Sequence, residues 1–184
     1  PKPVQGQYAV SGAMRKDRVR IVAVGYQEGE AVLAKSVSIA EQVTPDQLDQ
    51  FVQVIFDLQA VRRHSQVLKL LDLLKPEWVN ENIHRELFFW KAESCYGLEN
   101  YDRAAWLYLN SAQLADQAQA SLWAQSARFK AAGSLVKAAL YDDAQAIYLR
   151  LLEETTSDAR KLAIKQELQQ IRLLRNAEKN KPDA

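Results

Sequence analysis

The residues that could do chemistry in this chain are few. The sequence contains one cysteine, Cys95, and two histidines, His64 and His84. Two histidines cannot complete a metal site by themselves, and the chain has no Gly-rich phosphate loop, no HExxH motif and no CxxC motif. Cys95 falls on the apolar face of a predicted helix, where packing is the expected role of a cysteine. The residue types therefore predict no enzyme, no cofactor and no metal site.

The charge balance argues against several classes of partner. The chain has 24 Lys and Arg residues against 23 Asp and Glu residues, and its net charge is +1. It therefore has no overall positive field to attract nucleic acid or an anionic membrane. No apolar run approaches the roughly 20 residues that a membrane-spanning helix needs, and the initial Pro-Lys-Pro does not resemble a signal peptide. We interpret the start as a linker, which leaves an upstream anchor open.

The N-terminal segment carries two competing patterns. Residues 1–13 mix Pro, Gly and Gln without periodicity, which predicts an extended arm. Residues 14–43 then contain apolar residues at helical spacing, which predicts a degenerate helical repeat. These residues are Val19, Val22, Ala23 and Tyr26. The competing interpretation is a β-hairpin over residues 19–39, because this stretch is rich in β-branched residues and Gln-Glu-Gly-Glu suits a turn.

From Thr44 onward the sequence predicts helices in pairs. Thr44 is a good N-cap, and Pro45 suits the first position of a helix. Val61, Tyr101 and Tyr141 are each predicted to open the second helix of a pair, and they follow one another at intervals of 40 residues. Self-similarity at a fixed interval indicates stacked units, because none of them can bury its apolar face alone.

The residue types within each unit resemble the tetratricopeptide repeat family. The family pattern has large, small and apolar residues in the first helix, then Ala and an aromatic residue in the second. The matching residues are Phe88, Ala92, Cys95, Ala104 and Tyr108 in the middle unit, Ala131, Ala132, Leu135, Ala144 and Tyr148 in the next, and Leu48, Phe51, Ile55, His64 and Leu68 in the first. His64 replaces a small residue, and the interval exceeds the family's length of about 34 residues, so HEAT-like helix pairs also suit it.

The resemblance implies an all-α fold, a right-handed α-solenoid of stacked helical hairpins. The repeats would occupy residues 14–156, a capping helix would follow at 157–177, and residues 178–184 would form a tail. In this family the first helix of each pair mainly lines the concave groove. Carried onto this chain, the resemblance implies a protein-binding groove of Asp49, Gln53, Phe56, Glu86, Phe89, Glu93, Tyr96, Phe129 and Lys130. The alternative is a hydrated face without a ligand.

The function expected from this pattern is a non-catalytic scaffold or adaptor that binds a protein segment during the assembly of a larger complex. One alternative is a structural or oligomerisation module that uses its ends and N-terminal arm, including in a homo-oligomer. A second is a helical-repeat nucleic-acid binder, which needs a basic stripe that the balanced charge does not provide. The compartment stays open between the cytoplasm and the bacterial cell envelope. The resemblance favours the envelope, where such modules commonly follow a short linker.

Overall fold

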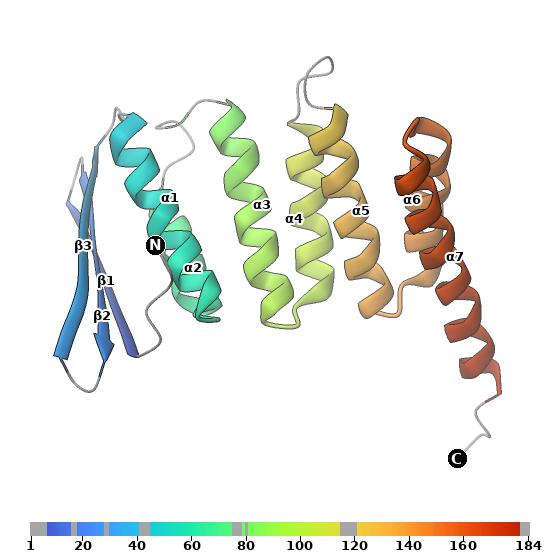
Figure 1. Cartoon of the computed structure of the whole chain (residues 1–184), viewed down its shortest axis with the longest axis horizontal. Helices are drawn as coiled ribbons and strands as arrows, with labels where there is room; N and C mark the ends of the chain where they lie inside the picture. The colour runs from blue at the N-terminus through green and yellow to red at the C-terminus, as the bar shows by residue number, and fades with distance from the viewer. Residues whose placement is uncertain are drawn as a thin grey trace. The chain divides into compact units, whose positions relative to one another are not determined.

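The structure, a computed structural model, describes residues 7–15, 18–27, 30–40, 45–74, 79, 81–114 and 121–180. The chain divides into two compact units, Pro1–Leu87 and Phe88–Ala184. The first unit combines a β-sheet with helices, and the second is helical throughout its described residues (Figure 1).

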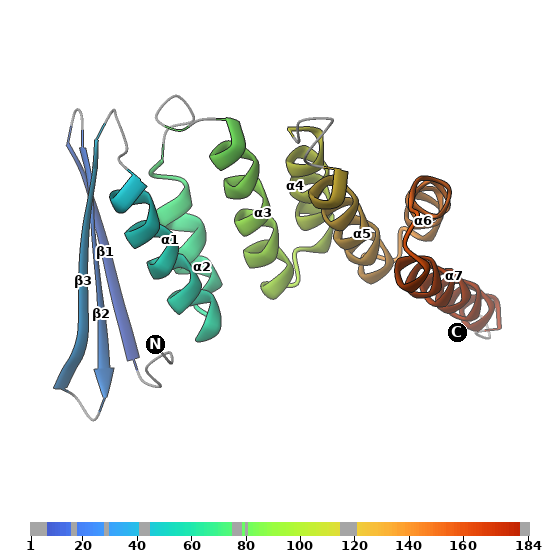
Figure 2. The same ribbon diagram turned by 45° about the horizontal axis from the view of Figure 1, so that its top comes forward.

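The first unit begins with a three-stranded antiparallel sheet in the order β1-β2-β3 (Figures 1 and 2). Its strands are β1 (Gln7–Arg15), β2 (Arg18–Gln27) and β3 (Glu30–Ala40). In the register, Arg15 pairs with Arg18 and Gln27 pairs with Glu30, so the pairing extends to the adjoining ends of consecutive strands. The ladder between β2 and β3 shifts at Gly25 and Tyr26, as at a β-bulge.

Over the described residues 7–15, 18–27 and 30–40, the sheet overturns the helical prediction made for residues 14–43 and the extended arm predicted for residues 1–13, and the rest of both ranges lies outside the described residues. The competing β-hairpin is confirmed, and β1 adds a third strand to it. The physical reason lies in the pairing, because Val19 lies opposite Ile39 and Ile21 opposite Val37. Cross-strand pairs of β-branched residues stabilise a sheet, whereas such residues lose side-chain freedom in a helix. The all-α prediction holds only from Pro45 onward.

Two helices, α1 and α2, follow the sheet in the first unit. Helix α1 (Pro45–Ala60) begins at Pro45 as predicted, while the expected cap Thr44 lies outside the described residues. Helix α1 lies against β3 and is followed by α2 (His64–Leu71). The core of this unit consists of fully buried apolar side chains. They are Phe51, Ile55, Leu58, Val67 and Leu71.

Helix α3 (Glu81–Gly97) leads into the second unit, where α4 (Tyr101–Gln113), α5 (Ser121–Lys137), α6 (Tyr141–Glu154) and α7 (Asp158–Lys179) follow. Consecutive helices from α4 to α7 pack against each other. Four alanines that match the repeat pattern are fully buried in this part of the chain. They are Ala92, Ala104, Ala132 and Ala144.

The last helix differs in detail from its prediction. Ile164 and Ile171 of α7 join the buried cluster of α5 and α6, whereas Leu162 is 60% exposed. Since α7 ends at Lys179, the tail predicted from residue 178 begins two residues too early.

Within the described residues, the same turn closes three helical hairpins. Arg62, Glu99 and Ala139 have φ angles of 59°, 61° and 60°, the left-handed conformation that ends many helices. The next N–H in each case bonds to the carbonyl five residues earlier, as from Asn100 to Cys95 at 2.9 Å and from Leu140 to Leu135 at 2.9 Å. These are Schellman motifs, so the three hairpins share one local geometry.

The turns correct the predicted repeat interval. Arg62 and Glu99 lie 37 residues apart, while Glu99 and Ala139 lie 40 apart. The interval of 40 is therefore right for the later hairpins and wrong for the first. Helices α4 and α6 open at the predicted residues, but α2 opens at His64 and not at Val61. No glycine occupies the left-handed position, so the turn at Arg62 had no glycine to mark it, whereas the 40-residue interval located the later two turns.

Candidate functional site

A lysine of the second unit lies inside a cluster contributed by three helices. We call the cluster of Phe89, Glu93, Tyr108 and Lys130 the Lys130 site. The Tyr108 hydroxyl on α4 donates a hydrogen bond to the Glu93 carboxylate on α3 at 2.5 Å. The Lys130 ammonium on α5 lies 2.6 Å from that carboxylate. It also lies 5.6 Å from the centre of the Phe89 ring and 5.8 Å from that of Tyr108, within cation–π range.

The Tyr108 hydroxyl is held in its neutral form. Burial raises the pKa of Tyr108 well above its usual value, and the hydrogen bond to Glu93 and the charge of Glu93 raise it further. The proton therefore stays on the phenol, which uses it to donate the hydrogen bond to the carboxylate. The Lys130 site is a complete arrangement in which the ammonium, the carboxylate and the hydroxyl all have partners.

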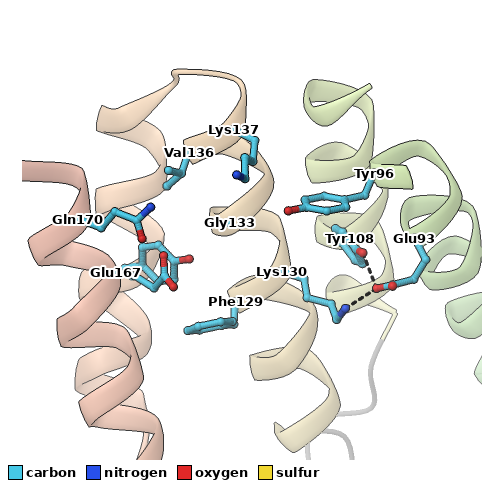
Figure 3. A pocket seen from close by; sticks show the side chains of 11 residues that line it. Glu93, Tyr96, Tyr108, Phe129, Lys130, Gly133, Val136, Lys137, Glu167 and Gln170 are labelled. Carbon is cyan, nitrogen blue, oxygen red and sulfur yellow. Dashed lines mark hydrogen bonds and ion pairs between the residues drawn. The ribbon is translucent and has the colours of Figure 1, made fainter. Parts of the chain in front are cut away.

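A cavity of about 440 Å³ lies beside the Lys130 site (Figure 3). We call it the Tyr148 pocket. Aromatic, charged and small side chains from five consecutive helices line it. They are Glu93, Tyr96, Tyr108, Phe129, Lys130, Gly133, Val136, Lys137, Tyr148, Glu167 and Gln170. In Figure 3, Glu167 and Gln170 reach from α7 toward α5, where Phe129 and Gly133 lie.

The Tyr148 pocket repeats part of the Lys130 site. The rings of Phe89 and Tyr108 lie 5.3 Å apart at 72°, and those of Phe129 and Tyr148 lie 5.3 Å apart at 66°. Each residue of the second pair follows its counterpart by 40 positions. The hydrogen bonding differs, because Gly133 stands 40 positions after Glu93 and has no carboxylate to offer.

The hydroxyl of Tyr148 is consequently left without an acceptor. The residue is 0% exposed, and its hydroxyl oxygen has no hydrogen-bond partner within the described part of the chain. Burial raises the pKa of Tyr148 far above its usual value, and the charge of Glu167 raises it further. A buried hydroxyl without a partner is costly, so a partner from outside the chain or from water would stabilise it.

The comparisons with known proteins do not extend this picture. No family model matches the chain, and neither a curated protein nor a solved structure is similar to it. The resemblance to tetratricopeptide repeats therefore rests on the residue pattern alone.

Five of the nine residues predicted for the groove gather in the second unit. Glu93, Tyr96, Phe129 and Lys130 line the Tyr148 pocket, and Phe89 packs under the Lys130 ammonium. They converge because α3 and α5 are the first helices of two consecutive hairpins, and the five residues lie on corresponding faces of these two helices.

The other four predicted residues belong to the first unit. Asp49 is exposed on α1, and Gln53 donates a hydrogen bond to the Asp57 carboxylate at 2.9 Å. Phe56 is also exposed, while Glu86 forms a 3.7 Å ion pair with Arg85. These contacts are local ones along single helices, and they do not define a site in this unit.

The sequence reasoning missed the residues that make the pocket distinctive. Tyr148 was named only as a residue that matches the repeat pattern, and Gly133, Glu167 and Gln170 were given no role. One signal was present, because the repeat aligns Tyr148 with Tyr108 but Gly133 with Glu93. It could be interpreted only once Glu93 was known to accept the Tyr108 hydrogen bond.

The structure offers no sign of a metal site or of a membrane-spanning helix in the residues it describes. No three His, Cys, Asp or Glu side chains among them lie close enough together to hold a metal ion. Similarly, none of the helices in the described ranges is both long and apolar enough to cross a bilayer. Cys95 is 1% exposed, in keeping with the packing role predicted for it.

Proposed function

We propose that this chain is a non-catalytic interaction scaffold, and that its second unit binds a segment of a partner protein at the Tyr148 pocket. The observation that carries the proposal is the convergence of aromatic and charged side chains from five helices on one open cavity. Its volume of about 440 Å³ falls in the range of ligand-binding cavities. Aromatic walls with a few polar groups are also typical of protein-binding hot spots.

The proposed architecture is a tetratricopeptide-like array of helical hairpins. Three observations support it: the shared Schellman turns, the 40-residue interval between the later two turns, and the buried alanines between helices. Helix α7 suits a capping role, because it buries Ile164 and Ile171 while its opposite face is exposed and largely charged or polar. In such arrays the helices form a concave surface for extended or helical segments.

The proposal can be tested by capture of partners from the native host. The pocket variant is Tyr96→Ala with Lys130→Ala, since both side chains are partly exposed and their loss leaves the core intact. The control is Trp106→Ala, which removes an aromatic side chain that is 58% exposed and does not line the pocket. Circular dichroism and thermal unfolding should first establish that all three proteins are equally folded.

We expect the wild type and the Trp106→Ala control to retain a partner that the pocket variant loses. Crosslinking through a photoreactive residue at position 96 should then place that partner at the pocket. A partner retained equally by all three proteins would contradict the proposal. It would move the interface away from the pocket and favour the structural or oligomerisation module.

A further inference from the structure

The Lys130 site shows how this fold binds a lysine side chain. Its ammonium is surrounded by a Phe–Tyr pair and a carboxylate, and all of these contacts lie within one chain. The carboxylate of Glu93 is 2.6 Å from the ammonium, and the two ring centres are 5.6 and 5.8 Å from it. The phenol of the pair completes the arrangement by donating to the same carboxylate.

The Tyr148 pocket has most of these parts in place, but neither of the lysines that line it in the described part of the chain, Lys130 and Lys137, makes a cation–π contact with the Phe129 or Tyr148 ring. Phe129 and Tyr148 reproduce the ring pair, at the same 5.3 Å separation. The next helix, α7, contributes Glu167 and Gln170 where α5 contributed Lys130 to the preceding pair. The pocket therefore holds two rings, a carboxylate and a buried hydroxyl, with open space in place of an ammonium.

We propose that the Tyr148 pocket binds a lysine side chain of the partner segment, with its ammonium near the Phe129 and Tyr148 rings and Glu167 as its counter-ion. This inference rests on the proposed function, because it names the chemistry of the partner at the same site. The Tyr148 hydroxyl, which has no hydrogen-bond partner among the described residues, offers an oxygen lone pair to the ammonium. Binding would thus satisfy a polar group that the described part of the chain leaves unpaired.

The charges around the pocket favour a cation over an anion at this point. Lys130 and Glu93 neutralise each other, since they form a 2.6 Å ion pair. Glu167 and Lys137 remain, and neither has an ion-pair partner among the described residues. Glu167 acts electrostatically on Tyr148, whereas Lys137 is an exposed residue in the last turn of α5. A bound carboxylate would meet Glu167 beside the rings, while an ammonium would be attracted to both.

The test uses three small probes that differ only in the group they offer. They are Nα-acetyl-lysine N-methylamide, the corresponding norleucine derivative, which keeps an apolar stem without charge, and the glutamate derivative. Each is titrated into the isotope-labelled full chain while backbone amide shifts are followed by NMR. We expect the lysine probe to shift the amides of Gly133, Glu167 and their neighbours, with an affinity several-fold above that of norleucine. The glutamate probe should bind more weakly than either.

Two single substitutions report on the charges. Glu167→Gln should lower the affinity for the lysine probe by about tenfold, because one partly desolvated ion pair is lost. Lys137→Gln should raise the affinity for the lysine probe by about twofold, because the substitution removes a nearby positive charge. A carboxylate-binding pocket would respond in the opposite direction to both changes, and that pattern would overturn the proposal.

A double variant provides a matched control in which the pocket is filled from within. Gly133→Glu with Gln170→Lys restores the carboxylate and ammonium of the Lys130 site. A Cβ atom at position 133 would lie 3.5 Å from the Tyr148 hydroxyl oxygen, which is ordinary contact, so the backbone at this position accommodates a side chain's first atom. We expect this variant to stay folded and to show no binding of the lysine probe.

The outcomes separate this inference from the proposed function. If no probe shifts the pocket amides, or if Glu167→Gln leaves the lysine affinity unchanged, the lysine assignment is wrong. The scaffold function still stands in that case, provided that the Tyr96→Ala, Lys130→Ala variant loses its partner. If the wild type and the Tyr96→Ala, Lys130→Ala variant capture the same partner equally well, the proposed function is wrong as well.

Discussion

Tyr108 and Tyr148 can be compared directly, because each belongs to a Phe–Tyr ring pair of similar geometry, but their hydroxyls differ in hydrogen bonding. The Tyr108 hydroxyl donates to Glu93 at 2.5 Å, whereas the buried Tyr148 hydroxyl has no partner among the described residues. Replacing each tyrosine by phenylalanine removes one oxygen and leaves the ring in place. The two variants therefore isolate the effect of hydrogen bonding on stability.

The expected magnitudes follow from what each hydroxyl contacts. Tyr108→Phe removes a hydrogen bond to a charged group, which contributes about 1.5–3 kcal/mol. Since the Glu93 side chain is 33% exposed and keeps Lys130 as a partner, we expect the lower end, about 1.5 kcal/mol. Tyr148→Phe removes a buried donor that has no acceptor, so it should cost nothing and could stabilise the fold by up to about 1 kcal/mol.

Urea unfolding of the full chain, followed by circular dichroism and tryptophan fluorescence, measures the difference. We expect the free energies of unfolding of the two variants to differ by about 2 kcal/mol, with similar denaturant slopes. Because the chain has two units, both signals are needed to show that the same transition is compared. A Tyr148→Phe variant that loses as much stability as Tyr108→Phe would refute the reasoning, since it would mean that the Tyr148 hydroxyl is already satisfied.

Four further predictions follow from the second unit. Burial raises the pKa of both Tyr108 and Tyr148, so stability should be constant below the unfolded value near pH 10 and fall above it, less steeply in either phenylalanine variant. Ile171→Ala, at a position 1% exposed in the α5–α7 core, should cost about 2–4 kcal/mol in urea unfolding. Cys95 should react with a thiol reagent only as fast as the unit opens, and reaction at the rate of a free thiol would contradict its burial. Gly133→Ala, in mid-helix, should raise the melting temperature through a helix preference of about 1 kcal/mol, and a decrease would show that the methyl group disturbs Tyr148.

The sequence by itself determined the helical part of this protein. Apolar spacing and the Thr-Pro start predicted the helix that begins at Pro45, and the 40-residue interval placed the openings of α4 and α6 at Tyr101 and Tyr141. The groove residues were named from the resemblance to tetratricopeptide repeats, and the structure brings five of them, on α3 and α5, to the Lys130 site and the Tyr148 pocket. That they bind a partner stays a prediction.

Only the tertiary structure decided the N-terminal sheet and the first turn. Val19, Val22, Ala23 and Tyr26 fit a helical face, but the strand pairing outweighs that local pattern, because each strand satisfies its backbone and its β-branched residues through a neighbour. The turn at Arg62 is left-handed without a glycine, so its register depends on how α1 and α2 pack and not on a local signal.

The chemistry of the site also depends on contacts between helices. Glu93, Tyr108 and Lys130 are distant in the sequence, and nothing in their spacing states that one carboxylate serves both the phenol and the ammonium. The same holds for Tyr148, whose sequence position is that of a packing residue. Among the described residues its hydroxyl has no partner, because the residue across from it is Gly133, and that relation exists only when α5 and α6 are packed together.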